Sequence, residues 1–182
     1  MSFHLWSFGH HSAVGADTMN WRLMAFEDLR VSELYEILRV RTEVFVLEQQ
    51  CLFQDMDGDD RQAMHVLGVR HGELQAYARC FAPGVKFAEA SIGRVLTRAN
   101  VRGTGLGHEL MEQAITAVSQ VWGPQPIRIG AQKRLASYYA EHGFKDAGKP
   151  YLEDGIEHVE MLLPDSHEWN QRDKQGVHAD GI

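Results

Sequence analysis

Three closely spaced glycines in residues 101–111 (VRGTGLGHELM) constrain this chain more than any other stretch. Glycine weakens helices and strands alike, so three of them directly before a helical pattern need a compensating role. Where a strand passes through such turns into the start of a helix, unpaired backbone N–H groups and the helix dipole favour an anion, above all a phosphate. A tight turn without a ligand is the alternative that the glycines alone leave open.

Two familiar phosphate-binding loops do not match this segment. A P-loop needs Gly-Lys-Ser/Thr, and a dinucleotide-binding loop needs a further glycine three positions after Gly105. His108 stands at both of those positions. What remains is Arg102-x-x-Gly105-x-Gly107, in which the arginine adds a fixed positive charge beside the glycines.

Length and composition indicate one globular domain. The chain has 182 residues, of which 44% are hydrophobic and 24% charged, as in ordinary water-soluble domains. Its net charge of −7, without a cluster of basic residues, argues against a nucleic-acid partner. No apolar run is long enough for a membrane span, and the two cysteines lack the spacing of a metal or redox motif. We therefore expect reduced thiols in a cytoplasmic protein.

The chain alternates strand and helix patterns, which predicts one mixed α/β domain at 20–164. We expect residues 1–19 to be a poorly ordered extension and residues 165–182 a polar tail. Period-two patterns predict strands at 21–26, 64–70, 74–81, 91–97, 127–132 and 158–163. Helical spacing predicts helices at 32–50, 106–121 and 134–142, the first with Ser32 as its N-cap.

At this point the sequence resembles a known family. Arg102-x-x-Gly105-x-Gly107, after a strand and before a helix, is similar to the pyrophosphate motif of the GNAT N-acetyltransferases. The segment from Gln132 to Phe144 (QKRLASYYAEHGF) resembles a second motif of that family, although Gln132 replaces its usual asparagine. Within the family the chain looks most like the ElaA group, through RTEVFVLEQ, FQDMDGDD, YAR, IGRV, GAQ and EDGIEH.

The resemblance implies a fold and a donor substrate. The family fold is a central mixed sheet of about six to seven strands flanked by about four helices, with parallel strands that splay apart at the CoA site. The implied donor is acetyl-CoA, with no metal. The residues implied to bind it are Val95, Leu96, Thr97, Arg102, Gly103, Thr104, Gly105, Gly107, His108, Gln132 and Tyr139.

The resemblance also assigns catalytic roles. Tyr139 matches the acid that protonates the leaving thiolate, and a phenol with an ordinary pKa of about 10 is protonated at neutral pH. A core aromatic is the alternative for Tyr139. For the general base we expect Glu48, with His65, His158 or a water relay as alternatives. Cys51 follows a helix, where the dipole opposes a thiolate, so a covalent acyl-enzyme is disfavoured.

The amine acceptor is not identified by any motif. Its pocket is expected near the end of the first long helix, lined by Arg41, Glu43, Gln49 and Tyr77. The acidic stretch 54–60 (QDMDGDD) does not fit a calcium loop, because Asp60 and Val66 fall where the glycine and the bidentate glutamate belong. These aspartates either hold a turn or attract a cationic acceptor.

The predicted function is therefore direct transfer of an acetyl or short acyl group from its CoA thioester to a primary amine. A CoA-binding sensor without turnover is one alternative. An enzyme similar to acyl-homoserine-lactone synthases is another, because Arg41 and 44–46 (VFV) loosely resemble that group. The acceptor is a small molecule or peptide rather than a nucleic acid or membrane. A homodimer is common in such folds.

Overall fold

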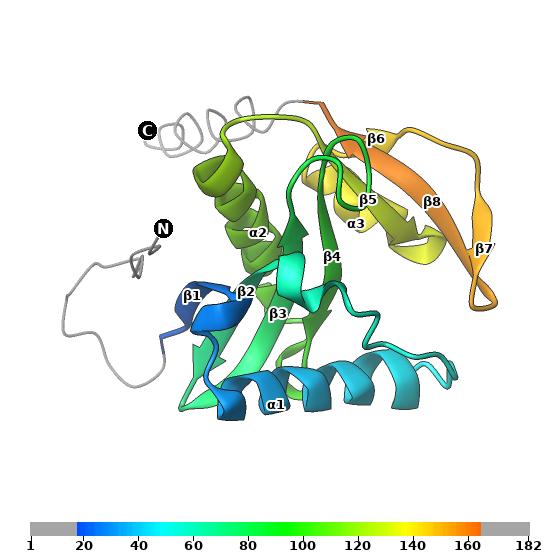
Figure 1. Cartoon of the computed structure of the whole chain (residues 1–182). Helices are drawn as coiled ribbons and strands as arrows, with labels where there is room; N and C mark the ends of the chain where they lie inside the picture. The colour runs from blue at the N-terminus through cyan, green and yellow to red at the C-terminus, as the bar shows by residue number, and fades with distance from the viewer. Residues whose placement is uncertain (1–17, 165–182) are drawn as a thin grey trace, which may run out of the picture.

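The computed structural model describes residues 18–164, in which eight strands form one sheet in the order β1-β2-β3-β4-β5-β8-β6, with β7 paired to β8 (Figure 1). The strands are β1 (Asn20–Ala25), β2 (Met64–Arg70), β3 (Glu73–Phe81), β4 (Ala90–Thr97), β5 (Ile127–Gln132), β6 (Lys145–Asp146), β7 (Tyr151–Glu153) and β8 (Ile156–Leu163). The helices are α1 (Val31–Arg41), α2 (Leu106–Trp122) and α3 (Ala136–Glu141). The predicted N-terminal extension (1–19) and C-terminal tail (165–182) lie outside the described residues, except for Thr18 and Met19.

The predicted mixed α/β architecture is confirmed, and every predicted strand is present. Two short strands, β6 and β7, were not predicted, because two and three residues are too few to show a period-two pattern. The described residues therefore contain one strand more than the upper expectation of seven, and three α-helices rather than about four. Among them, no helix combines the length and apolar character needed to cross a bilayer.

The first helix differs from its prediction at both ends. Its N-cap is Arg30, not Ser32, because the Glu33 carboxylate accepts a hydrogen bond from the backbone N–H of Arg30 at 2.9 Å. Ser32 therefore lies within the first turn. At the other end the α-helix gives way to a π-helical segment, Thr42–Leu47. A π-helical turn rotates the side chains that follow it relative to those of the α-helix before it. Such turns are frequent at functional sites.

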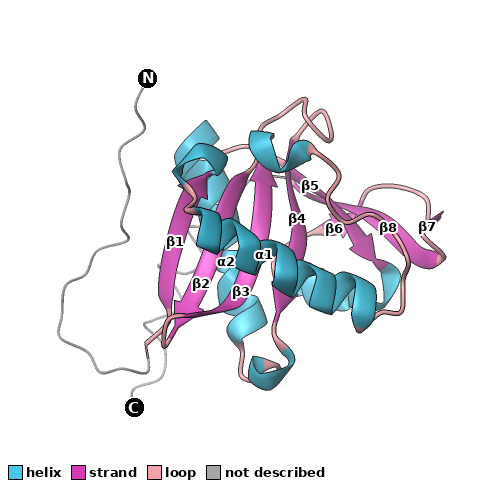
Figure 2. Cartoon of the chain, turned by 60° about the horizontal axis from the view of Figure 1, so that its bottom comes forward, coloured by secondary structure: helices cyan, strands magenta, loops and turns pink. Residues whose placement is uncertain are grey.

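Two separate apolar cores cover the two faces of the sheet. Helix α2 packs on one face, where Leu110, Met111, Ala114 and Ile115 are fully buried against β2, β3, β4, β5 and β8. Helix α1 packs on the other face through Ile37 and Val40, but its core includes only β1 to β4. The α1 side of β5 and β8 thus has no helix over it among the described residues (Figure 2).

The two parallel strands in the middle of the sheet separate soon after they begin. β4 and β5 pair only at Ala90 with Ile127 and at Ser91 with Arg128. Beyond Ser91, β4 continues beside β3 while β5 continues beside β8. The predicted splay of parallel strands is confirmed, and it opens the sheet on the side that α1 does not cover.

Candidate active site

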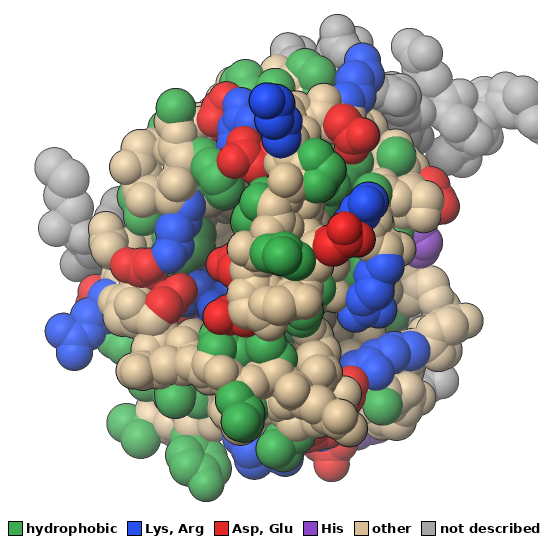
Figure 3. All heavy atoms as spheres, turned by 90° about the vertical axis from the view of Figure 1, so that its right-hand side faces the viewer, with side chains coloured by type: hydrophobic (Ala, Val, Ile, Leu, Met, Phe, Trp, Pro, Cys, Tyr) green, Lys and Arg blue, Asp and Glu red, His purple; other side chains and the backbone are tan. Residues whose placement is uncertain are grey.

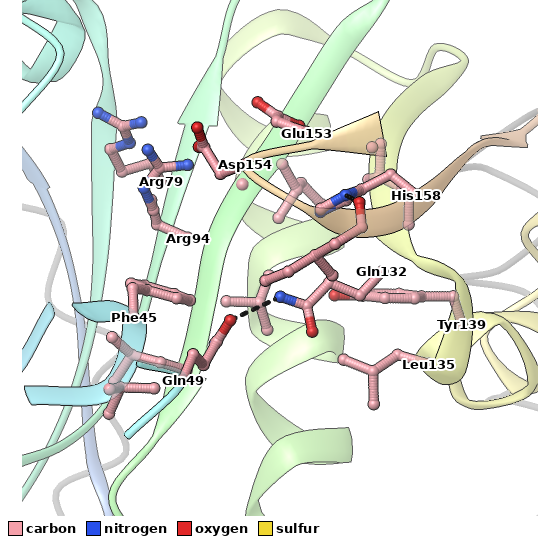
Figure 4. Close-up of a pocket in the computed structure, with 18 of the residues that line it drawn as sticks. Phe45, Gln49, Arg79, Arg94, Gln132, Leu135, Tyr139, Glu153, Asp154 and His158 are labelled. Carbon is pink, nitrogen blue, oxygen red and sulfur yellow. Dashed lines mark hydrogen bonds between the residues drawn. The ribbon is translucent and has the colours of Figure 1, made fainter. Parts of the chain in front are cut away.

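A cavity of about 1120 Å³ lies at the splay between β4 and β5. The π-helical segment and the loop after it form one wall, and the β7–β8 hairpin forms the opposite wall (Figure 4). The hairpin reaches the loop itself, because Cys51 donates from its Sγ to the carbonyl of Asp154 at 3.5 Å. Of the predicted donor and catalytic residues, the cavity is lined by Glu48, Val95, Leu96, Thr97, Arg102, Gly107, Gln132 and Tyr139.

Strand β4, which lines the cavity, has a bulge in its ladder with β3. Tyr77 of β3 pairs with Leu96, but Arg79 pairs with Gly93, so β4 has one residue more than β3 across this interval. Arg94 adopts a left-handed conformation with φ of 50°. An extra residue in one strand leaves backbone groups without ladder partners, and bulges often lie beside active sites.

Arg94 is held in this unusual conformation from several sides. Its Nε donates to the Asp55 carboxylate at 2.6 Å, and its guanidinium lies 5.7 Å from the ring centre of Phe45 and 5.5 Å from that of Phe53. Contacts of this number are needed to keep a non-glycine residue in a strained region. Sequence reasoning missed this residue, because a bulge depends on pairing with a distant strand.

The glycine segment forms the turn that enters α2. Gly103 and Gly105 have φ of 76° and 87°, a region that costs residues with a Cβ about 1–2 kcal/mol. A Cβ at either position would meet no protein atom within 4 Å, so these glycines are required by conformation and not by crowding. Gly105 is the N-cap of α2, and Thr104 closes the turn by donating from Oγ1 to the Val101 carbonyl at 2.8 Å.

The remaining two positions of the segment have other constraints. A Cβ on Gly107 would lie 3.5 Å from the hydroxyl of Tyr138, which donates to the Gly107 carbonyl at 2.5 Å. His108 directs its backbone N–H to the Gly105 carbonyl at 3.0 Å, and its imidazole lies 3.0 Å from that of His142. The backbone N–H of His108 is thus already bonded, whereas the first N–H groups of a helix have no intrahelical acceptor.

Arg102 lies beside this turn and is exposed to solvent. Its guanidinium donates to the carbonyl of Thr97 at 3.0 and 3.2 Å and to the carboxylate of Glu48 at 2.7 Å. Glu48, the residue predicted as the general base, is therefore an ion-pair partner of the predicted pyrophosphate arginine.

Tyr139 and Gln132 face the cavity from the other side. Tyr139 is 8% exposed, and burial raises the pKa of its phenol to about 12. Gln132 donates from Nε2 to Oε1 of Gln49 at 2.9 Å, a hydrogen bond that spans the cavity between β5 and the segment after α1 (Figure 4). Of the four residues predicted for the acceptor pocket, Gln49 lines the cavity.

The other three predicted acceptor-pocket residues have different places. Arg41 is fully buried and donates to Asp55 at 2.7 Å and to Asp60 at 2.5 Å. Tyr77 is also fully buried, and its hydroxyl lies 2.7 Å from Nδ1 of His65. Glu43 faces outward and pairs with Arg39 at 3.4 Å. None of these three side chains lines the cavity, and the burial of Arg41 and Tyr77 depends on partners elsewhere in the chain that helical spacing does not show.

The acidic stretch is a structural clamp. Asp55 and Asp60 bind Arg41, while Asp57 and Asp60 bind Arg79 at 2.8 and 2.9 Å. Asp57 also accepts the backbone N–H of Asp59 at 3.1 Å, a turn of the kind that the aspartates predict. Within residues 18–164 no group of three or more potential ligands is arranged to hold a metal ion.

The two alternative bases differ in their surroundings. His65 is fully buried, and its burial lowers its pKa to about 4. It lies in the core beside Tyr77 and is not a lining residue. His158 lines the cavity on β8, where its ring stacks on Tyr151 with 5.6 Å between centroids. Its Nδ1 lies 2.9 Å from the carbonyl of Ile156.

Comparison with known proteins agrees with this geometry. The family model described as an acetyltransferase (GNAT) domain matches residues 32–164. The chain is 39% identical to a UPF0039 protein of Synechocystis over 80% of its length and 95% of the relative. It is 37% identical to the protein ElaA of Escherichia coli over 79% and 95% of the two chains.

Solved structures show the same similarity. A crystal structure of an acyl-CoA N-acyltransferase from Pseudomonas aeruginosa superimposes with a TM-score of 0.76 at 40% identity, covering 80% of this chain and 99% of that one. The crystal structure of Escherichia coli ElaA gives a TM-score of 0.75 at 36% identity, with the same coverage. The CoA-dependent acyl-homoserine lactone synthase BjaI, at 15% identity and a TM-score of 0.68, is similar in fold alone.

Proposed function

Because this chain belongs to the acetyltransferase (GNAT) domain family, we propose that it transfers the acetyl group of acetyl-CoA to a primary amine. The observation that carries the proposal is one cavity lined by Arg102 and by Gly107 of the first turn of α2, with Tyr139 in its wall. These groups match the parts of an acyl-CoA thioester: an anionic pyrophosphate, an extended arm and a sulfur that must leave as a thiol.

The donor end has the chemistry that a pyrophosphate needs. The positive-φ turn at Gly103 and Gly105 is open above the backbone, so that phosphate oxygens can approach N–H groups at the start of α2. Arg102 supplies a guanidinium, for which phosphate would compete with Glu48. The backbone of Val95 to Thr97, next to the bulge, would pair with the amide groups of the arm.

The transfer is direct in this proposal. The amine nitrogen attacks the thioester carbonyl, a C–N bond forms, the C–S bond breaks, and the nitrogen loses one proton while the sulfur gains one. Tyr139 would supply the proton to sulfur, because a phenol with a pKa of about 12 stays protonated at neutral pH. Holding the two reactants together supplies up to about 7–11 kcal/mol of the barrier reduction.

The base that receives the amine proton is Glu48 or a water molecule. Glu48 lines the cavity, and its ion pair with Arg102 would open when phosphate takes over the guanidinium. Glu48→Gln separates the two routes, because only a Glu48 base predicts a large fall in turnover at saturating acetyl-CoA.

The test is thiol release from acetyl-CoA across a panel of amines, combined with calorimetric binding of CoA. Amine-dependent release together with CoA binding supports the transferase. CoA binding without release for any acceptor would instead indicate the sensor. A preference for acyl-carrier-protein donors over CoA thioesters would favour the lactone-synthase alternative.

A further inference from the structure

One basic side chain of the cavity is fixed in place while its terminal nitrogens are unused. Arg94 lines the cavity, and its hydrogen bond to Asp55 runs from Nε at 2.6 Å. Its Nη1 and Nη2 form no hydrogen bond or ion pair within residues 18–164. The side chain is 26% exposed, and neither Nη belongs to the buried polar atoms. A ligand in the cavity can therefore reach both nitrogens.

The neighbouring arginines of the acidic clamp are saturated, which sets Arg94 apart. Arg41 donates to aspartates of the clamp from Nε and both Nη groups, and Arg79 donates to them from both Nη groups. Asp55 gives one carboxylate oxygen to Arg94 and the other to Arg41. The Nη side of Arg94 thus has no anionic partner among the described residues.

The guanidinium of Arg94 is oriented before any ligand binds. It lies 5.7 Å from the ring centre of Phe45 and 5.5 Å from that of Phe53, and Asp55 fixes its Nε. A free arginine side chain loses rotamer freedom when it binds a ligand. Here the folded protein has already restricted these rotamers, so that an anion binds at a smaller entropic cost. Strained residues that their surroundings hold in this way cluster at ligand sites.

The bulge places Arg94 at the reacting end of the donor. In the proposed function the pyrophosphate lies at Arg102 and the arm follows the backbone from Thr97 to Val95. The thioester then comes next in line, beside residue 94, and the attacking amine must lie close to its carbonyl carbon. An acceptor group bound by Arg94 is therefore a near neighbour of that amine. The anion that a planar guanidinium binds best, through two parallel hydrogen bonds, is a carboxylate or a phosphate.

The charges around the cavity favour an acceptor without net charge. Glu153 and Asp154 line the hairpin wall, and neither forms an ion pair with a described residue. Figure 4 shows the side chains of Arg94 and Asp154 pointing into the same space from the strand and from the hairpin. On the face that the hairpin presents, basic and acidic side chains are interspersed without a large patch of one sign (Figure 3). A purely anionic ligand would be repelled by the hairpin, whereas a zwitterion has a charge for each side.

We propose that the acceptor is an α-amino acid, whose carboxylate is bound by Nη1 and Nη2 of Arg94 while its α-amine attacks the thioester. The bonds that form and break are those of the proposed acyl transfer. The proposal rests on the proposed function, because the donor arm sets the position of the amine. Arg94 is then a specificity-determining residue, which selects amines that have a carboxylate on the adjacent carbon.

The experiment compares the common L-amino acids with their α-amides, which keep the amine and the carbon skeleton but have no negative charge. Thiol release from acetyl-CoA gives kcat/KM, and calorimetry gives the affinity of each amine with and without CoA. At least one amino acid should be used and bound at least about tenfold better than its amide, as expected for hydrogen bonds between charged groups.

Arg94→Lys tests the role of the guanidinium. Lysine keeps the positive charge and can pair with Asp55, but it lacks the planar pair of Nη donors. The preference for the amino acid should fall to about twofold or less, while kcat/KM for the amide changes less than about twofold. Arg94→Asn should have the same effect, since asparagine tolerates the φ of 50°. Thermal unfolding of both variants shows whether they are folded.

Arg134→Lys is the matched control. It makes the same substitution at another arginine that lines the cavity, but Arg134 is exposed and bonds to Gln132 through Nε, away from the bulge. The ratio of amino acid to amide should stay at its wild-type value.

Three results would overturn the amino-acid proposal and leave the acetyltransferase intact. The first is equal use of amino acids and amides by the wild-type protein. The second is an equal fall of kcat for both in Arg94→Lys, which would mean that Arg94 acts on the thioester carbonyl. The third is an equal effect of Arg134→Lys on the ratio. Absence of both CoA binding and thiol release with every amine would instead refute the proposed function, and calorimetry of the amines without CoA distinguishes the two failures.

Discussion

Replacing Gly105 by aspartate changes the charge of the glycine turn without demanding a new backbone conformation. Gly105 has φ of 87° and is the N-cap of α2. Aspartate and asparagine are the side chains that best tolerate this region, and both are good N-caps. Since a Cβ there meets no protein atom within 4 Å, neither substitution produces a clash. The Asp and Asn variants differ in one charge and almost nothing else.

The size of the effect follows from Coulomb's law. A carboxylate about 4 Å from one phosphate charge repels it by about 1 kcal/mol in bulk water and by about 4 kcal/mol at an effective dielectric constant of about 20. Position 105 is exposed, so the lower half of that range applies, and we expect CoA to bind about fivefold to 70-fold more weakly to Gly105→Asp than to Gly105→Asn. Gly105→Glu should abolish binding.

The assay is isothermal titration of CoA into each variant, with thermal unfolding measured in parallel. Gly105→Asp should unfold at the same temperature as Gly105→Asn or higher, since a carboxylate stabilises a helix N-terminus by about 0.3–1 kcal/mol. The difference in CoA affinity should shrink at high salt. Equal affinities of the two variants at low salt would refute the assignment of this turn as the pyrophosphate site.

Three other predictions concern the chemistry and the core. Tyr139→Phe should lower kcat about 100-fold with CoA affinity changed less than twofold, whereas an unchanged kcat would mean that another group protonates the thiolate. Arg41→Met should lower the free energy of unfolding in urea by about 3–5 kcal/mol, because two buried aspartates lose their cation. The control Arg39→Met removes an exposed ion pair and should lower it by at most about 1 kcal/mol. The pKa of His65 is about 4 in the folded protein, so protonation of this imidazole disfavours the folded state. We expect the free energy of unfolding to be highest above pH of about 6.5 and to decrease as the pH falls towards 4. His65→Gln should flatten this part of the pH–stability curve, and an unchanged slope would contradict the buried neutral imidazole.

Local patterns in the sequence were sufficient for most of the fold. Strands β2 and β5 have the predicted bounds, because alternation of apolar residues is a property of the strand itself. The turn at Gly103 and Gly105 was equally predictable, since positive φ and a helix start are both local requirements. The similarity to a family predicted the splayed strands, which no periodicity indicates and which the structure contains.

The tertiary structure alone decided which side chains surround the cavity. Arg41 and Tyr77 have the polar groups of a binding pocket, but they are buried by contacts with residues 12 to 19 positions away. Arg94, Ser91 and Asp154 showed no signal in the sequence, since a bulge, an unpartnered hydroxyl and the approach of a hairpin to Cys51 all depend on which strands lie side by side. Short-range periodicity determines the elements, whereas the charge and shape of a cavity depend on side chains that meet only after the sheet has formed.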